Sequence, residues 1–245
     1  MEESYSTTYH GLEENHWWFL GRRDIIYKLI KDYQRDIEIL EIGCSGGPLI
    51  RFLKEHGFRR LQGIDIDKKA IEICKQKGIT DVSVADAKKT GFKDQQFSII
   101  IASDILEHIR DEDKALLEWH RILKPSGKLF IFAPAYNFLW SRHDEINHHY
   151  RRYSKSRLIK TLEKNGFKTE KVSFWNFSLF LPVCLFRLTH KLLSSNKRGS
   201  VEQLCETNTL MNKTLGYILK LENKLLSGRI NFPLGVSIFA IAKKI

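Results

Sequence analysis

The stretch ILEIGCSGGPLIRFL, residues 39–53, decides the fold, because one kind of pattern replaces another within a few residues. Its first part is a short apolar run typical of a buried strand, and its last part has apolar residues at helical spacing. Between them stand Gly43, Ser45, Gly46 and Gly47. Glycine adopts backbone conformations that other residues avoid, and it has no Cβ to block a ligand. The stretch therefore predicts a strand, a tight turn with accessible backbone N–H groups, and a helix.

Outward from this stretch, short apolar runs alternate with amphipathic helical patterns over residues 36–133. Runs such as FSIII (97–101) and KLFIFA (128–133) lack polar alternation, which is typical of parallel strands covered by helices on both faces. Two further strand patterns, KTEKVSFWNF (168–177) and GVSIFAIAKK (235–244), follow later in the chain. This order predicts a doubly wound α/β fold with a mostly parallel sheet of seven strands.

Helical segments precede and interrupt this sheet. Residues 1–35 contain an amphipathic pattern from about Glu13 to Lys31, which we expect to form an N-terminal helical lid. Residues 36–245 are expected to form one domain. This domain contains a helical insertion at about 178–234, because the last two strands are separated by a gap too long for a simple connection.

The composition limits the partners and the cellular location that we expect for this protein. The chain has 245 residues and a formal net charge of +11, which favours anionic partners such as phosphates, nucleic acid or acidic membranes. The four cysteines are widely spread and no histidine cluster has zinc spacing, so we expect neither a disulfide framework nor a metal site. The N-terminus lacks a secretory signal pattern, and the most apolar stretch (174–188) is too short to cross a bilayer. These features predict a cytoplasmic protein, with peripheral membrane contact as an alternative.

Acidic residues after the next strands sharpen the prediction for the glycine turn. Asp65 follows Gly43 by 22 residues and ends the second strand pattern, where a carboxylate can accept hydrogen bonds from both ribose hydroxyls of a nucleotide. Up to this point, a nicotinamide-dependent oxidoreductase fits the sequence equally well. The later stretches VADA (84–87) and ASDILEHI (102–109) distinguish the two classes.

With these stretches included, the chain resembles the class I S-adenosylmethionine-dependent methyltransferases, in particular the group that acts on small molecules. The matching pieces, in the family's order and spacing, are EIGCSGG (41–47), GIDID (63–67), ADA (85–87), SDILEHI (103–109) and LKPSGK (123–128). The resemblance covers roughly residues 36–175 and the last strand pattern. It implies methyl transfer, with S-adenosyl-L-methionine as the cofactor and S-adenosyl-L-homocysteine as its product.

The resemblance also implies roles for the matching residues. Gly43 and Gly47 would surround the methionine part of the cofactor, and Glu41 would support the turn or bind the cofactor's amino group. Asp65 would hold the ribose hydroxyls, and Asp86 would meet the adenine amino group. The full set implied on the cofactor side of the motifs is Glu41, Gly43, Cys44, Ser45, Gly47, Asp65, Ile66, Asp86, Ala87, Ser103, Asp104 and His108.

Two features lie outside the usual motif. Ser45 replaces the middle glycine of the family's Gly-x-Gly-x-Gly turn, and its hydroxyl can donate to the cofactor carboxylate. In the N-terminal helix, Trp18 and Arg22 are i,i+4 neighbours and share one face. The stretch HWWFLGRR (16–23) resembles the lid helix of some relatives, which would place Trp17, Trp18 or Arg22 over the cofactor. Simple packing of this helix against the sheet is the alternative.

Histidines and arginines gather in WSRHDEINHHYRRYSKSRL (140–158), directly after the fifth strand pattern. A hydroxyl or amine acceptor must lose a proton, and histidine has a pKa suited to a base near neutral pH. We therefore expect His143 or His148 to act as the base. The other substrate-side candidates, which would bind an anionic group or contact the acceptor, are Arg151, Arg152 and Tyr153. A solvated polar loop is the alternative interpretation of this segment.

Together these observations predict methyl transfer to a small-molecule or lipid- or sugar-linked acceptor, with oxygen as the expected atom. An RNA methyltransferase is a second candidate because of the charge, but no RNA-binding module is recognisable and SDILEH replaces an Asn-Pro-Pro-Tyr type motif. A non-catalytic, cofactor-binding regulatory subunit is a third. The insertion at 178–234 would cap the pocket, form a dimer surface or lie on an anionic membrane. The chain is accordingly expected as a monomer or a homodimer.

Overall fold

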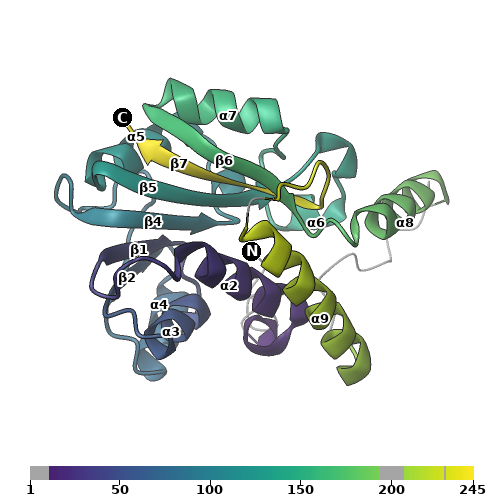
Figure 1. The fold of residues 1–245 in the computed structure, drawn as a ribbon, viewed down its shortest axis with the longest axis horizontal. Helices are drawn as coiled ribbons and strands as arrows, with labels where there is room; N and C mark the ends of the chain where they lie inside the picture. Colours follow the sequence, from purple (N-terminus) through teal and green to yellow (C-terminus); the bar gives the residue numbers. More distant parts are fainter. Residues whose placement is uncertain (1–10, 194–206, 229) are drawn as a thin grey trace.

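In the computed structural model, which describes residues 11–193, 207–228 and 230–245, a seven-stranded sheet forms the centre of the molecule (Figure 1). The strand order is β3-β2-β1-β4-β5-β7-β6. Neighbouring strands are parallel except at β7, which pairs antiparallel with both β5 and β6. The prediction of a doubly wound, mostly parallel sheet of seven strands is confirmed. The strands are β1 (Glu38–Ile42), β2 (Arg60–Asp65), β3 (Val82–Val84), β4 (Phe97–Ser103), β5 (Leu123–Pro134), β6 (Phe167–Trp175) and β7 (Ser237–Lys244).

Helices cover both faces of this sheet, which buries the apolar runs of the central strands on both sides. One apolar layer packs against α2 (Trp17–Ile30), α3 (Pro48–Glu55), α4 (Lys68–Gln76) and α9 (Thr209–Leu226). The other layer packs against α5 (Glu112–Ile122) and α7 (Lys155–Lys164). The remaining helical elements are the 3-10 turns η1 (Leu106–His108) and η2 (Asn137–Leu139), α6 (Arg142–Ile146) and α8 (Phe180–Leu193).

Local sequence signals set the helix ends that position the strand termini. Asp67 caps α4 by accepting a hydrogen bond from the backbone N–H of Lys69, and Ser154 caps α7 through the N–H of Arg157. Pro48 occupies the first turn of α3, where its missing N–H costs nothing. These short connections keep the carboxyl ends of β1, β2, β4 and β5 at one edge of the sheet.

The long helix α9 lies along the N-terminal helix α2 (Figure 1). Leu219 is fully buried against Gly21, where a Cβ atom would come within 2.4 Å of Leu219 Cδ1. Asn223 Nδ2 donates to the Gly21 carbonyl and to Asp24 Oδ2, at 2.8 Å each. The insertion before the last strand therefore holds the N-terminal helix against the sheet.

The predicted insertion contains the two expected helices, α8 and α9. Residues 194–206, which join them, and residues 1–10 of the predicted lid lie outside the described residues. Helix α8 projects from the body of the molecule (Figure 1), and its Leu181 and Leu185 side chains are exposed by 68% and 64%. None of the described helices combines the length and apolarity that a bilayer crossing requires.

Candidate active site

The glycine turn after β1 adopts the backbone that its sequence predicts. Gly43, Ser45 and Gly47 have left-handed φ values of 75°, 46° and 78°. A Cβ at Gly43 would lie 2.0 Å from Ile105 Cδ1, and one at Gly47 would lie 2.5 Å from Ile79 Cδ1. Both glycines are thus required by conformation and by packing. Ser45, which stands in place of the family's middle glycine, also adopts a left-handed conformation.

Asp65 joins the end of β2 to this turn. Its Oδ2 accepts the backbone N–H of Ser45 and its Oδ1 accepts that of Asp67, at 2.9 Å each. Burial raises the pKa of the Asp65 carboxyl, and these two hydrogen bonds partly oppose the increase. The carboxylate is therefore held in one orientation beside the turn, with acceptor capacity left for a ligand.

Glu41 lies beneath the turn with only 8% of its surface exposed. Its Oε2 has no hydrogen-bond partner among the described residues. Burial, reinforced by the nearby Glu13 carboxylate, raises the pKa of Glu41 well above its ordinary value. A buried carboxyl oxygen without a partner is costly. A cationic hydrogen-bond donor placed beside it, such as an ammonium group, would remove that cost.

These groups line a cavity of about 980 Å³ at the carboxyl edge of the sheet. The residues predicted for the cofactor side line it, with two exceptions, Gly47 and Trp17. Gly47 stabilises the turn by donating its N–H to the Cys44 carbonyl, and Trp17 lines the smaller cavity. Sequence reasoning did not single out Glu13, Arg23 and Tyr150, which also line the cavity. Glu13 and Arg23 belong to the N-terminal segment. Arg23 ends the stretch that resembles a lid helix, but the resemblance indicated only Trp17, Trp18 and Arg22. The predicted cofactor residues that line this cavity are Trp18, Arg22, Glu41, Gly43, Cys44, Ser45, Asp65, Ile66, Asp86, Ala87, Ser103, Asp104 and His108.

Arg22 connects the N-terminal helix to the ends of two strands. Its Nη2 donates to Asp104 Oδ1 at 3.3 Å and to Ser237 Oγ at 3.2 Å. The guanidinium carbon lies 4.7 Å from the ring centroid of Trp18 and 4.1 Å from that of Trp175, within cation–π range. Trp18 and Arg22 thus pack against the sheet and border the cavity at the same time.

A smaller cavity of about 290 Å³ adjoins the large one, since Trp18, Asp104 and His108 line both. Its other walls come from the segment after β5, from the start of β7 and from α8, which contributes Val183 and Arg187. The remaining lining residues are Trp17, Glu107, Pro134, His143, Asn147, His149, Arg152, Asn176, Leu179, Val236 and Ser237.

The two histidines predicted as bases have different positions. His143 lines the small cavity, and burial lowers its pKa to about 4, so that its ring is neutral at physiological pH. His148 is exposed and lines neither of the two cavities. His149, which sequence reasoning did not select, lines the small cavity, and its Nδ1 lies 2.8 Å from Asp144 Oδ1.

The other substrate-side candidates are engaged in structural contacts. Arg152 borders the small cavity, but its Nε and Nη2 bind the two oxygens of the buried Asp144 at 2.8 and 2.9 Å. Tyr153 is fully buried and donates its hydroxyl to Glu112, with which Arg151 also forms an ion pair. Arg151 and Tyr153 line neither cavity. Their charged and polar groups stabilise the segment that carries the histidines.

Comparison with known proteins identifies the family of this chain. Residues 40–131 match the family model described as a methyltransferase domain. A probable S-adenosylmethionine-dependent methyltransferase of Mycolicibacterium smegmatis is 24% identical over 66% of this chain, and the match spans 64% of that relative. An uncharacterised protein of Methanocaldococcus jannaschii is 31% identical, with 66% of this chain and 80% of the relative matched. A ubiquinone biosynthesis O-methyltransferase of Pelagibacter ubique is 29% identical over 64% of this chain and 75% of its own length.

A solved methyltransferase structure has a similar fold. The methyltransferase bound to the Trm112 activator of Haloferax volcanii superimposes with a TM-score of 0.64, covering 99% of this chain and 95% of the other at 15% identity. The predictions of family and cofactor are confirmed, and the nicotinamide-dependent alternative is set aside. The chain belongs to the class I S-adenosylmethionine-dependent methyltransferases, a family whose cofactor is S-adenosyl-L-methionine.

Proposed function

We propose that this protein methylates an oxygen atom of an acceptor that has an apolar portion, either a small molecule or a lipid- or sugar-linked compound. The observation that carries this proposal is the pair of adjoining cavities. The larger one has the turn and carboxylates expected for the cofactor, and the smaller one combines histidines with apolar side chains. Because the two cavities share walls, an acceptor bound in the small cavity would lie next to the methionine end of the large one.

The residues of the large cavity fit the predicted cofactor. The unpartnered Oε2 of Glu41 suits the amino group of the methionine part, and the fixed carboxylate of Asp65 suits the ribose hydroxyls. Ile66, which is 71% exposed, offers an apolar surface to the adenine ring. When bound, the cofactor supplies an activated methyl group that the acceptor oxygen takes up as the carbon–sulfur bond breaks.

On the acceptor side, we propose His143 as the group that receives the hydroxyl proton. Its neutral ring lines the small cavity and can accept a proton as the oxygen becomes bonded to carbon. Trp17 and Trp18 close one wall of the cavity and limit the access of water. Alignment of the two reactants in a confined space supplies a large part of the rate in such displacements.

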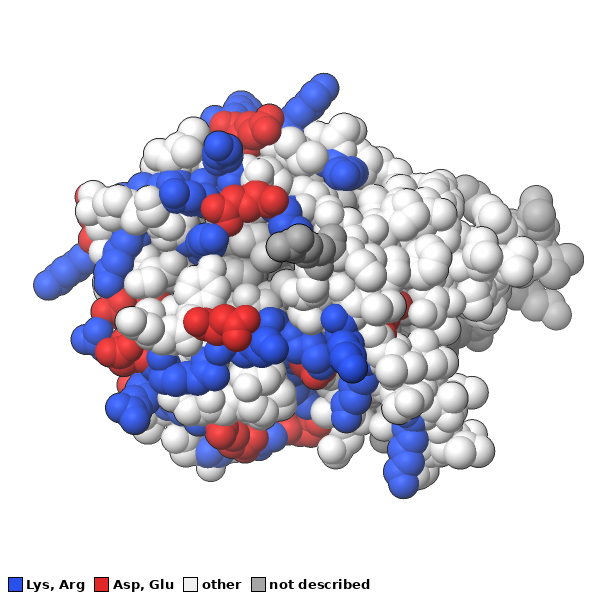
Figure 2. Space-filling view, viewed as in Figure 1, with Lys and Arg blue, Asp and Glu red and all other residues white. Residues whose placement is uncertain are grey.

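The surface around α8 supports an acceptor with an apolar portion. Val183 of α8 lines the small cavity, while Leu181, Leu185 and Leu188 of the same helix are exposed. Figure 2 shows the surface around α8 as mostly uncharged, whereas charged side chains gather over the opposite end of the molecule. Amphipathic helices of this kind lie in the interfacial region of membranes. We propose that the insertion at 178–234 contacts a membrane peripherally and admits the acceptor from that side.

Three further parts of the proposal come from sequence patterns. They are the cytoplasmic location, the monomeric or homodimeric state, and the division into a helical lid (1–35) and a catalytic domain (36–245). The named activity of the Pelagibacter relative, an O-methyltransferase of ubiquinone biosynthesis, supports oxygen as the atom and an isoprenoid-type compound as the acceptor class.

The proposal is tested by three measurements on the full chain. Calorimetry should detect micromolar binding of S-adenosylhomocysteine and no binding of nicotinamide cofactors. Incubation with methyl-labelled S-adenosylmethionine and either a lipid extract or total RNA should then label the organic phase. Label in the RNA would favour the RNA methyltransferase, and cofactor binding without any methyl transfer would favour a regulatory subunit. In sedimentation with anionic liposomes, an unbound protein would contradict the membrane contact.

A further inference from the structure

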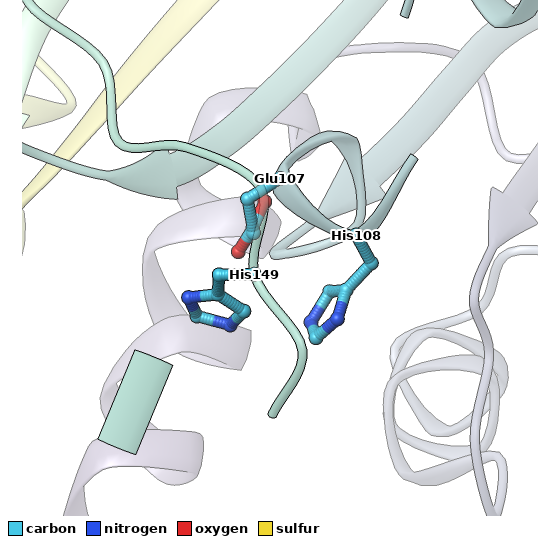
Figure 3. A group of neighbouring side chains, drawn as sticks. All are labelled: Glu107, His108 and His149. Atoms are coloured by element: carbon cyan, nitrogen blue, oxygen red, sulfur yellow. The ribbon is translucent and has the colours of Figure 1, made fainter. Parts of the chain in front are cut away.

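We propose that Glu107, His108 and His149 form a binding site for one divalent transition-metal ion of the zinc type in the wall of the small cavity. The sequence pattern predicts no metal site, because the first two residues belong to η1 and the third follows α6, 41 residues later. Only the fold brings them together. Figure 3 shows the three side chains pointing toward a common point between these two segments.

The geometry suits a compact cation site. One donor atom from each residue lies within 4.8 Å of the other two. Zinc binds imidazole nitrogen and carboxylate oxygen at about 2.0–2.2 Å, so that ligand atoms in a tetrahedral site stand roughly 3.3 Å apart. On binding, the side chains would have to bring the three donor atoms to this spacing from within the 4.8 Å limit.

Glu107 supplies an independent reason to expect a cation. Its side chain is only 1% exposed, and its Oε2 has no hydrogen-bond partner among the described residues. A buried polar atom that lacks a partner destabilises the folded state. A metal ion among these three side chains would neutralise the carboxylate and satisfy this oxygen.

The contact of His149 with a buried carboxylate is of the kind that metal-binding histidines make. Its Nδ1 lies 2.8 Å from Oδ1 of Asp144, a fully buried carboxylate that Arg152 holds in place. A proton on Nδ1, donated to Asp144, leaves the lone pair of Nε2 for a metal ion. Metal-bound histidines almost always donate their other N–H to a carboxylate or a carbonyl.

The donor set selects the class of metal. Two imidazoles and one carboxylate suit zinc, cobalt and iron, whereas magnesium and calcium prefer oxygen ligands. Three protein ligands leave a coordination position open toward the cavity. An acceptor hydroxyl bound there would lose its proton to His143 or to water more readily. This role rests on the proposed function, whereas the binding of the metal does not.

The test uses the untagged full chain, stripped of metal with a chelator and titrated with Co²⁺ by absorption spectroscopy and with Zn²⁺ by calorimetry. We expect one ion per chain, and visible Co²⁺ bands typical of four- or five-coordination. His149→Ala removes a ligand, and Glu107→Gln replaces a carboxylate with a neutral, weaker amide ligand, so each should weaken binding by about 100-fold. The control is His148→Asn, which changes an exposed neighbour outside both cavities and keeps a residue that tolerates its left-handed φ of 54°.

Less than one bound ion per chain, or equal affinities in Glu107→Gln and the unmodified protein, would overturn the proposal. Thermal unfolding in metal-free buffer shows whether each variant is folded. If His149→Ala does not fold, the metal affinity of Glu107→Gln alone tests the proposal. Binding of S-adenosylhomocysteine in the presence of chelator is measured on the same samples. Intact cofactor binding without metal binding would remove only this inference, whereas metal binding without cofactor binding would remove the proposed function.

Discussion

Replacing Asp65 by Asn tests the assignment of the large cavity most directly. The two oxygens of Asp65 are oriented by the N–H groups of Ser45 and Asp67, each at 2.9 Å. A carboxylate accepts about four hydrogen bonds, so roughly two remain for the ribose hydroxyls. The amide keeps one acceptor oxygen and turns its NH₂ group toward one of those backbone donors. The variant therefore loses one ribose hydrogen bond and the charge assistance of the other.

The expected size of the effect follows from these losses. Hydrogen bonds to charged groups contribute about 1.5–3 kcal/mol each, and we expect a total loss of about 2–3 kcal/mol in the binding of S-adenosylhomocysteine. This corresponds to an affinity lower by roughly 30- to 150-fold.

Calorimetry at constant salt measures this change, and Asp81→Asn is the matched control. Asp81 pairs with Lys54 at the surface and lines neither cavity. Its substitution should leave the affinity within about twofold of the unmodified protein. A folded Asp65→Asn protein that binds the ligand within about threefold of the unmodified protein would refute the assignment.

Three other variants test the fold. Gly43→Ala places a side chain at a φ of 75° and 2.0 Å from a neighbouring methyl group. Both the cofactor affinity and the stability of the fold should therefore fall. Unchanged binding in calorimetry would contradict the described turn. Leu219→Ala removes a fully buried side chain, which should lower the free energy of unfolding by about 2–5 kcal/mol. The melting temperature in scanning calorimetry should then fall by roughly 5–15 °C. A shift below about 2 °C would contradict the described contact between α2 and α9. Burial alone would raise the pKa of Glu118, but hydrogen bonds from Arg121 and Thr90 outweigh it and lower the pKa from 4.5 to about 2. The Glu118 carboxylate therefore stabilises the fold above about pH 4.5 and loses this effect as the pH falls toward 2. Glu118→Gln should cost on the order of 2 kcal/mol at pH 7 and progressively less in urea titrations below pH 4, whereas a difference independent of pH would argue against the ion pair.

The sequence alone determined the parts of this protein that depend on near neighbours in the chain. The glycine turn, the fully apolar strands and the helix caps at Asp67 and Ser154 are local, because φ preference, burial on both faces and capping involve residues a few positions apart. Asp65 was predictable for the same reason, since parallel strands place their carboxyl ends at one edge.

Only the tertiary structure decided how β7 enters the sheet and which polar groups meet in the small cavity. β7 is antiparallel between β5 and β6, an arrangement set by packing across the whole sheet. The segment at 140–158 offers several charged and polar side chains of similar chemistry, and spacing does not tell which of them pair with one another. In the fold, Asp144 binds Arg152 and His149, Glu112 binds Tyr153, and His149 lies beside Glu107. The pairs Glu112–Tyr153 and Glu107–His149 join parts of the chain about 40 residues apart, so they form only when the strands and helices have packed. The pairs of Asp144 are close in sequence, but spacing alone does not select them among the neighbouring charged residues.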